Sequence, residues 1–168
     1  MSDSTAIPGR SPAESVAIHT TTILPADTNA YGNLFGGALV ALIDKTASIT
    51  ASRHARRNVV TASIDRVDFL QPVRLGDILT LTARLNWTGR TSMEIGVEAH
   101  AENRIDGSGM LACFALLTFV AIGDAGRPVP VPPALAVTDD EKRRYEEGRL
   151  RSEARRAAAG PATPRPQA

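Results

Sequence analysis

Hydrophobic and polar residues alternate along five stretches of the chain, and these stretches are rich in β-branched residues. Alternation bounded by Gly, Pro, Asn or Asp is typical of strands that bury one face. We therefore predict five strands, at residues 14–24, 58–70, 78–89, 91–103 and 109–122. The turn sequence TGR and the Asp-Gly of RIDGSG join the last three strands, which should form an antiparallel meander.

The segment between the first two strands follows a helical pattern instead. Between about Gly37 and His54, large side chains recur at spacings of three and four positions: Leu39, Leu42, Ile43, Thr46 and Ile49. Many remaining positions are Ala or Ser, which let a sheet approach closely. The expected architecture is α+β, with one long helix wrapped by a curved antiparallel sheet.

Composition divides the chain into three parts. Residues 1–13 are rich in Ser, Pro and Gly and are expected to be disordered, residues 14–124 form the domain, and residues 125–168 form a Pro-rich linker and a charged tail. In the tail, Thr138 precedes acidic and then basic residues, the order that suits a helix dipole. Because large apolar residues are few there, we expect a solvated or frayed helix, with a partner-binding helix as the alternative.

The balance of charges argues against a nucleic-acid or membrane partner. The chain has 168 residues with 19 basic and 18 acidic side chains, a net charge of +1. It has neither a secretory leader pattern nor an apolar run of the roughly 18 residues that a membrane span needs. The chain has a single cysteine, Cys113, so an internal disulfide is excluded. We expect Cys113 to be a small, buried apolar side chain. We expect a cytoplasmic protein without a metal site.

Asp44 interrupts the apolar helical segment. A carboxylate among apolar neighbours loses solvation unless it is paired or its site is wet. It shares a helix face with Val40, Ala47, Ser48 and Ala51. A cleft acid and a solvent-facing carboxylate paired with Lys45 or His54 both remain open on the pattern alone.

The start of the same helix carries a second chemical feature, the pair Gly36-Gly37. Glycines there can leave backbone N–H groups uncovered at the positive end of the helix dipole, where they would polarise a carbonyl or stabilise an oxyanion. A simple turn is the alternative. Asn33 could likewise hold a carbonyl through its amide or merely close an Asx turn.

Three segments together resemble a known family: LPADTNAYGNLFGGALVALIDKTASITASRHARRNVVTASIDRVDFLQPVRLGD, NWTGRTSMEIGV and LLTFVAI. They are similar to the hot-dog-fold acyl-CoA thioesterases, in particular the broad-specificity bacterial group related to brain-type acyl-CoA hydrolase. The resemblance spans about residues 14–125. It implies a five- or six-stranded antiparallel sheet around one helix, and homo-oligomers with a dimer as the smallest unit, commonly trimers of dimers.

The resemblance also implies roles for individual residues. The family's helix carboxylate falls on Asp44 and its active-site Asn on Asn33. Asn33 and the amides near Gly36 and Gly37 would polarise the thioester carbonyl of an acyl-CoA, while Asp44, from the other subunit, would act as general base or as nucleophile. No cofactor is implied, because CoA is part of substrate and product.

Residues for binding CoA are expected in three places. These are the basic cluster at the helix end, the strand after it, and the GRTS turn, with the candidates Arg53, Arg56, Arg57, Thr61, Ser63, Arg90, Thr91 and Ser92. Each has a plainer alternative: dipole-favoured bases at the helix end, and hydroxyls that cap strand ends in a hairpin.

Two positions depart from the family pattern, which often has His at Tyr31 and Glu at Lys45. Neither change removes a residue that the mechanism needs, although both bear on substrate preference. A hydratase would want a His beside the acid, and the first one after Asp44 is His54, more than two turns away. A non-catalytic acyl-CoA sensor of the same fold is the remaining alternative to hydrolysis.

Overall fold

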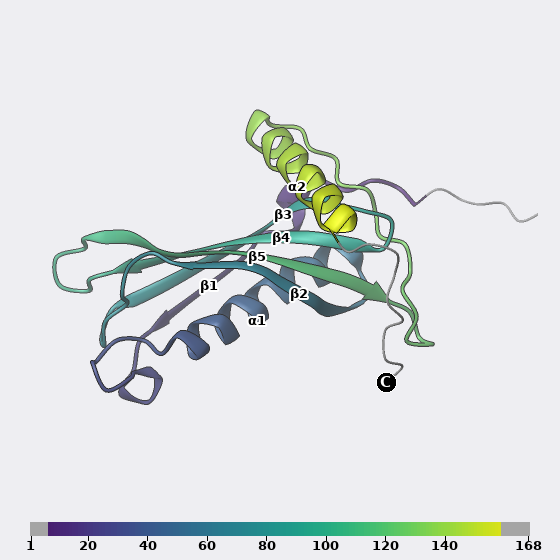
Figure 1. The fold of residues 1–168 in the computed structure, drawn as a ribbon. Coiled ribbons are helices and arrows are strands. Elements are labelled where there is room, and N and C mark those ends of the chain that lie inside the picture. Colours follow the sequence, from purple (N-terminus) through teal and green to yellow (C-terminus); the bar gives the residue numbers. More distant parts are fainter. Residues whose placement is uncertain (1–6, 159–168) are drawn as a thin grey trace, which may run out of the picture.

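The computed structural model describes residues 7–158 and contains one antiparallel sheet with a long helix on each side (Figure 1). In chain order the elements are η1 (Pro12–Ser15), β1 (Ala17–Thr22), η2 (Pro25–Asp27), α1 (Gly36–Ala55), β2 (Asn58–Phe69), β3 (Ile78–Thr88), β4 (Ser92–Glu102), β5 (Gly109–Ile122) and α2 (Asp139–Ala158). The five predicted strands and the predicted helix are therefore confirmed.

The sheet has the strand order β1-β3-β4-β5-β2, and all neighbouring strands are antiparallel. The last three strands form the predicted meander. β2 instead crosses to the far edge, where β5 is its single partner within the described region. Two register shifts interrupt this pairing, between Thr61 and Ser63 and between Ile64 and Arg66. β2 thus presents a long edge with much of its surface exposed.

The concave face of the sheet holds the hydrophobic core with α1. Leu39, Ile43, Ala47 and Ala51 of α1 are at most 4% exposed. They meet a row of buried side chains from the central strands, among them Leu81, Leu85, Ile95, Val97, Leu117 and Phe119. The alanines at the helix surface let the sheet curve closely around α1, as the composition predicted.

Helix α1 ends where the backbone changes conformation at Arg56. Arg56 adopts a left-handed conformation with φ of 51°, and its N–H donates to the Ser52 carbonyl. Left-handed residues commonly close helices in this way. Arg53 lies in the last turn, where positive charge is favoured by the helix dipole.

The tail helix α2 lies across the opposite face of the sheet (Figure 1). Its side toward the sheet buries Glu141, Gly148 and Ser152. A Cβ atom on Gly148 would stand 2.7 Å from the Trp87 Cβ, so glycine permits the close approach. The helix itself was predicted, but its description as solvated or frayed is wrong on this side.

The contact between α2 and the sheet includes a buried carboxylate. Glu94 of β4 is fully buried and accepts hydrogen bonds from Asn86, Arg151 and Arg155. The Arg151 Nη2 lies 2.7 Å from Glu94 Oε1, and this contact raises the pKa of Arg151. Because a buried charge is stable only when it is paired, α2 and Glu94 depend on each other.

The segments before β1 and after β5 are tied to the end of α1. Residues 1–6 of the predicted disordered segment lie outside the described residues, while Arg10 pairs its backbone with the 133–135 segment and donates through Nη1 to the His54 carbonyl. The His54 ring is buried between Ser15 and the Pro132 carbonyl. The Pro-rich linker therefore binds against the end of α1.

Neither α1 nor α2, the two long helices of the described region, has the length and apolar character required to cross a bilayer.

Candidate functional site

Asp44 lies partly buried in the middle of α1, beside the edge strand β2. The Thr61 hydroxyl donates a hydrogen bond to its Oδ1, with 2.7 Å between the oxygens. The alternative of an ion pair with Lys45 or His54 is not observed: within residues 7–158 no basic group lies within 4.0 Å of the Asp44 carboxylate. Asp44 is thus a carboxylate held by one hydroxyl, with its second oxygen available for chemistry.

A second group of candidates lies at the start of α1, around a cavity of about 340 Å³. Asn29, Asn33 and Gly36 line it, together with Phe69 and the turn that follows β2. Asn33 and Gly36, both predicted, are therefore brought together. Apolar side chains form the rest of the wall, namely Leu34, Leu39, Leu70, Pro72 and Val73, beside the amide of Gln71.

Asn29 was not among the residues predicted from the sequence. Its side-chain oxygen accepts hydrogen bonds from the backbone N–H groups of Tyr31, at 2.9 Å, and Asn33, at 3.2 Å. The Asx turn in this loop is thus made by Asn29, and it holds the Asn29 NH₂ group as a donor at the cavity. The resemblance assigned the active-site asparagine to Asn33, four positions later in the same motif TNAYGN, and Asn29 was not considered.

The glycines at the start of α1 were expected to leave backbone N–H groups uncovered. Neither Gly36 nor Gly37 has a positive φ, so glycine is not needed there for backbone conformation. Phe35 occupies the N-cap position and provides no side-chain hydrogen bond to the first turn. The first amides of the helix therefore keep donor capacity, and the missing side chain of Gly36 leaves this end open to the cavity.

A single chain does not bring the two groups together. Gly36 and Asp44 are separated by two turns of α1, about 12 Å along the helix axis at 1.5 Å per residue. Asp44 is not part of the lining of the Asn29–Asn33 cavity. One small substrate group cannot contact both places within one chain.

The three arginines predicted at the end of α1 differ in their contacts and exposure. The Arg53 guanidinium donates to the Val16 carbonyl, and the Arg53 carbonyl accepts from Arg10. Arg53 thus serves the structure of this region. Arg56 and Arg57 are exposed, and none of the three lines the pocket that contains Arg90.

That pocket, of about 640 Å³, lies between the GRTS turn, β2 and the last turns of α2. It brings together four predicted residues, Ser63, Arg90, Thr91 and Ser92, with Arg155 and Arg156. Thr61 is not among them, because it points to Asp44 on the other face of the sheet. Ser63 donates to Asp65 at 2.6 Å, so its proton is already used.

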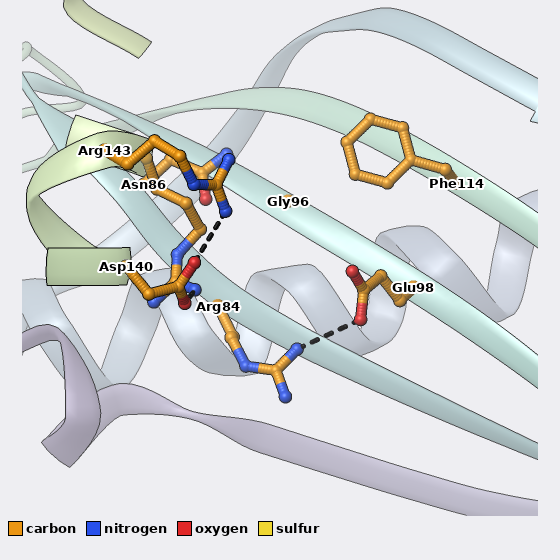
Figure 2. A pocket seen from close by; sticks show the side chains of 8 residues that line it. Arg84, Asn86, Gly96, Glu98, Phe114, Asp140 and Arg143 are labelled. Carbon is orange, nitrogen blue, oxygen red and sulfur yellow. Dashed lines mark hydrogen bonds and ion pairs between the residues drawn. The ribbon is translucent and has the colours of Figure 1, made fainter. Parts of the chain in front are cut away.

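A smaller pocket of about 250 Å³ lies at the other end of α2 (Figure 2). Arginines line it too, but they are paired: Arg84 with Glu98 at 3.4 Å, Arg143 with Asp140 at 2.6 Å, and Arg144 with the same Asp140. These pairs are drawn in Figure 2, with Phe114 across the pocket. The paired charges leave little net attraction for a ligand.

Cys113 is fully buried, and burial, helped by the negative charge of Asp68, raises the pKa of its thiol to about 11. It is thereby unsuited to act as a nucleophile, since the thiolate is the reactive form. No three His, Cys, Asp or Glu side chains of residues 7–158 are arranged to hold a metal ion. The described part of the chain therefore offers Asp44 as its candidate reactive group.

Several known proteins are similar to this chain in sequence. The Thioesterase superfamily profile matches residues 31–108. YkhA of Bacillus subtilis (strain 168), by name an uncharacterized acyl-CoA thioester hydrolase, is 44% identical over 128 residues, which cover 76% of this chain and 74% of YkhA. The cytosolic acyl coenzyme A thioester hydrolase of Rattus norvegicus is 39% identical over 129 residues, but the chain spans only 34% of its length.

Solved structures show the same fold. An apo-hexameric acyl-CoA thioesterase superposes with a TM-score of 0.88 at 42% identity, covering 93% of this chain and all of the other. An acyl-CoA hydrolase of Staphylococcus aureus, in complex with butyryl coenzyme A, coenzyme A and coenzyme A disulfide, superposes with a TM-score of 0.84 at 41% identity, covering 90% and 92% of the two chains. The chain belongs to the thioesterase superfamily, among the hot-dog-fold acyl-CoA thioester hydrolases.

Proposed function

We propose that this protein hydrolyses acyl-CoA thioesters to the free acid and CoA, with Asp44 as the reactive carboxylate. The observation that carries the proposal is the hydrogen bond from Thr61 to Asp44. It fixes a carboxylate that has no cationic partner within the described residues, so one oxygen can accept a proton from water or attack the carbonyl. In either role the thioester C–S bond breaks and the CoA sulfur leaves as a thiol after protonation. With Asp44 as base, the activated water becomes part of the free acid directly; with Asp44 as nucleophile, a mixed anhydride forms first, and water then hydrolyses it to the free acid and the Asp44 carboxylate.

The carbonyl of the thioester would be polarised at the start of α1. Gly36, at the positive end of the helix dipole, and the two asparagines line one cavity, and Gly37 follows Gly36 in the first turn. Such donors stabilise the negative charge that develops on the carbonyl oxygen. In this proposal, Asp44 supplies the general-base or nucleophilic chemistry, and the donors at the start of α1 supply the electrostatic stabilisation.

The distance between these two ends supports a site shared by two copies of the chain. β2 has a free edge, and antiparallel pairing of two β2 strands about their midpoint would place the Thr61 end of one copy beside the Phe69 end of the other. Thr61 holds Asp44, and Phe69 lines the asparagine cavity. We infer a homodimer as the smallest active unit, with trimers of dimers as the assembly, as the hexameric relative suggests.

Either Asn29 or Asn33 can supply the amide. The sequence resemblance favours Asn33. Structures of the Staphylococcus aureus hydrolase have been solved with an aspartate, an asparagine or a threonine replaced by alanine, and those three positions are spaced along that chain as Asn29, Asp44 and Thr61 are along this one. This spacing, with the fixed amide of Asn29, supports Asn29 as the donor and leaves Asn33 as the alternative.

Hydrolysis needs no group other than water and substrate, so we propose that the enzyme works without a cofactor. The cytoplasmic location expected from the sequence stays a prediction. The competing function is an acyl-CoA sensor of the same fold that binds without reacting.

The test is the release of free thiol from a panel of short to long acyl-CoAs. We expect the wild type to turn over, Asp44→Asn to lose at least about 100-fold in kcat, and the exposed control Asp124→Asn to match the wild type. Asn29→Ala and Asn33→Ala, compared in the same assay, identify the carbonyl donor as the one that loses about 100-fold. A wild type that binds acyl-CoAs but releases no thiol from any of them would establish the sensor instead.

A further inference from the structure

The pocket between the GRTS turn and α2 has the chemistry of a phosphate site. Three guanidinium groups, those of Arg90, Arg155 and Arg156, line its walls, and no carboxylate is among its lining residues. Hydroxyls of Thr91, Ser92 and Ser152 line it as well. Cations and hydroxyl donors without a lining acid attract phosphate groups, which accept several hydrogen bonds at once.

The three arginines are not equivalent. Arg155 lies 3.3 Å from Glu94 and 3.5 Å from Asp65, so its charge is already balanced. Arg156 has no carboxylate within 4.0 Å in residues 7–158, and its guanidinium lies 5.7 Å from the centre of the Trp87 ring. The ring stabilises the cation without neutralising it. Arg156 therefore keeps a full positive charge on the α2 wall of the pocket.

Arg90 provides the matching charge from the sheet side. Its turn is held by backbone hydrogen bonds from Val131 to the Arg90 carbonyl and from Ala121 to the Thr91 carbonyl. On the other side, α2 is held by the buried pairs of Arg151 and Arg155 with Glu94. Both walls of the pocket are thus held by contacts within the protein.

We propose that Arg156 of α2, together with Arg90, binds the phosphate groups of the CoA portion of the substrate. The tail helix then belongs to the binding site and is more than a cover for the outer face of the sheet. This inference rests on the proposed function for the identity of its ligand. Its chemistry requires a phosphate-bearing ligand, and the pantetheine thiol end alone is not sufficient.

The experiment measures binding of free CoA and of pantetheine, which lacks the phosphates, by calorimetry with the full-length protein. We expect Arg156→Gln to weaken CoA binding about tenfold or more, the size of one lost charge-assisted hydrogen bond. Pantetheine binding should not change. The matched control is Arg149→Gln on the same helix, since Arg149 pairs with Glu146 and Glu153 and does not line the pocket.

Kinetics provide the second measurement. Arg156→Gln should raise KM for an acyl-CoA by a similar factor, leave kcat unchanged, and leave KM for the corresponding acyl-pantetheine unchanged. An equal loss for both substrates, or CoA affinity equal to that of Arg149→Gln, would overturn the inference. If the wild type binds CoA through Arg156 but hydrolyses nothing, the proposed function fails while the phosphate site stands.

Discussion

The Thr61 hydroxyl donates a hydrogen bond to Oδ1 of Asp44, at 2.7 Å, and so connects the edge strand β2 to the middle of α1. Thr61 was predicted as a CoA-binding residue, and in the structure its hydroxyl is engaged with the Asp44 carboxylate. A single hydrogen bond of this kind leaves the second oxygen free. The position of Asp44 in the site then depends on how β2 lies against α1.

This relationship predicts that Thr61 affects turnover more than substrate binding. Thr61→Val keeps the shape of the side chain and removes the donor, so the carboxylate loses its fixed orientation. We expect kcat to fall by about 10- to 100-fold, in line with the sensitivity of catalysis to small misplacements, with little change in KM. Thr61→Ser restores the hydroxyl and should recover most of kcat. A rise in KM at constant kcat would show that Thr61 binds substrate instead.

The buried Glu94 predicts a large effect on stability far from Asp44. Glu94→Gln leaves Arg151 without its buried counter-charge and Arg155 with Asp65 alone. We expect the free energy of unfolding in urea to fall by about 3 kcal/mol, the lower end for breaking a buried ion pair, because the arginines are one-third exposed.

The control for this prediction is Glu98→Gln on the same strand. Glu98 pairs with Arg84, and both side chains are substantially exposed. Its loss should therefore cost less than about 1 kcal/mol. Equal effects of the two substitutions would mean that α2 does not depend on the Glu94 pairs.

His54 predicts a loss of stability at mildly acidic pH. Its Nε2 donates to the Pro132 carbonyl at 2.9 Å, so Nδ1 accepts from Ser15, and the ring is neutral and buried. Burial lowers the pKa of His54 below 6.5; the Pro132 carbonyl opposes this shift, and Arg10 adds to it. The unfolded chain therefore takes up the proton first as pH falls, and stability present above about pH 6.5 declines below it.

The check is the free energy of unfolding between about pH 7 and pH 5. His54→Gln, which cannot titrate, should show a flatter pH dependence than the wild type over this range. His100→Gln, an exposed histidine of β4, should keep the wild-type slope. Identical slopes in all three proteins would contradict a buried neutral His54.

Cys113 is predicted to be inert in the folded protein. Because the pKa of its thiol is raised to about 11, the thiolate is scarce at neutral pH, and the side chain is fully buried. A disulfide reagent such as Ellman's should react only after unfolding, and Cys113→Ala should keep the wild-type kcat. Rapid modification of the native protein with loss of activity would assign Cys113 a part in the chemistry.

Sequence patterns were sufficient for the fold because its elements follow local periodicity. The alternation in β3, β4 and β5 and the three- and four-residue spacing in α1 each reflect which face is buried, and that face is decided within a few neighbouring positions. Asp44 could be singled out for the same reason, because it interrupts an apolar pattern. The resemblance assigned the active-site amide to Asn33 and passed over Asn29, because the backbone N–H groups that the Asn29 side chain accepts from are brought to it only by the folded loop.

What the tertiary structure decided is which charged residues have partners. In the alternating pattern of β4, Glu94 occupies an outward-facing position that solvent would normally cover, and α2 has the composition of a solvated helix. Only the fold places Arg151, 57 residues later, within 2.7 Å of Glu94 and brings Arg156 to the pocket of Arg90. Burial of a strand face follows from local sequence, whereas pairing of charges depends on the distance between segments far apart in the chain, and that distance exists only once the chain has folded.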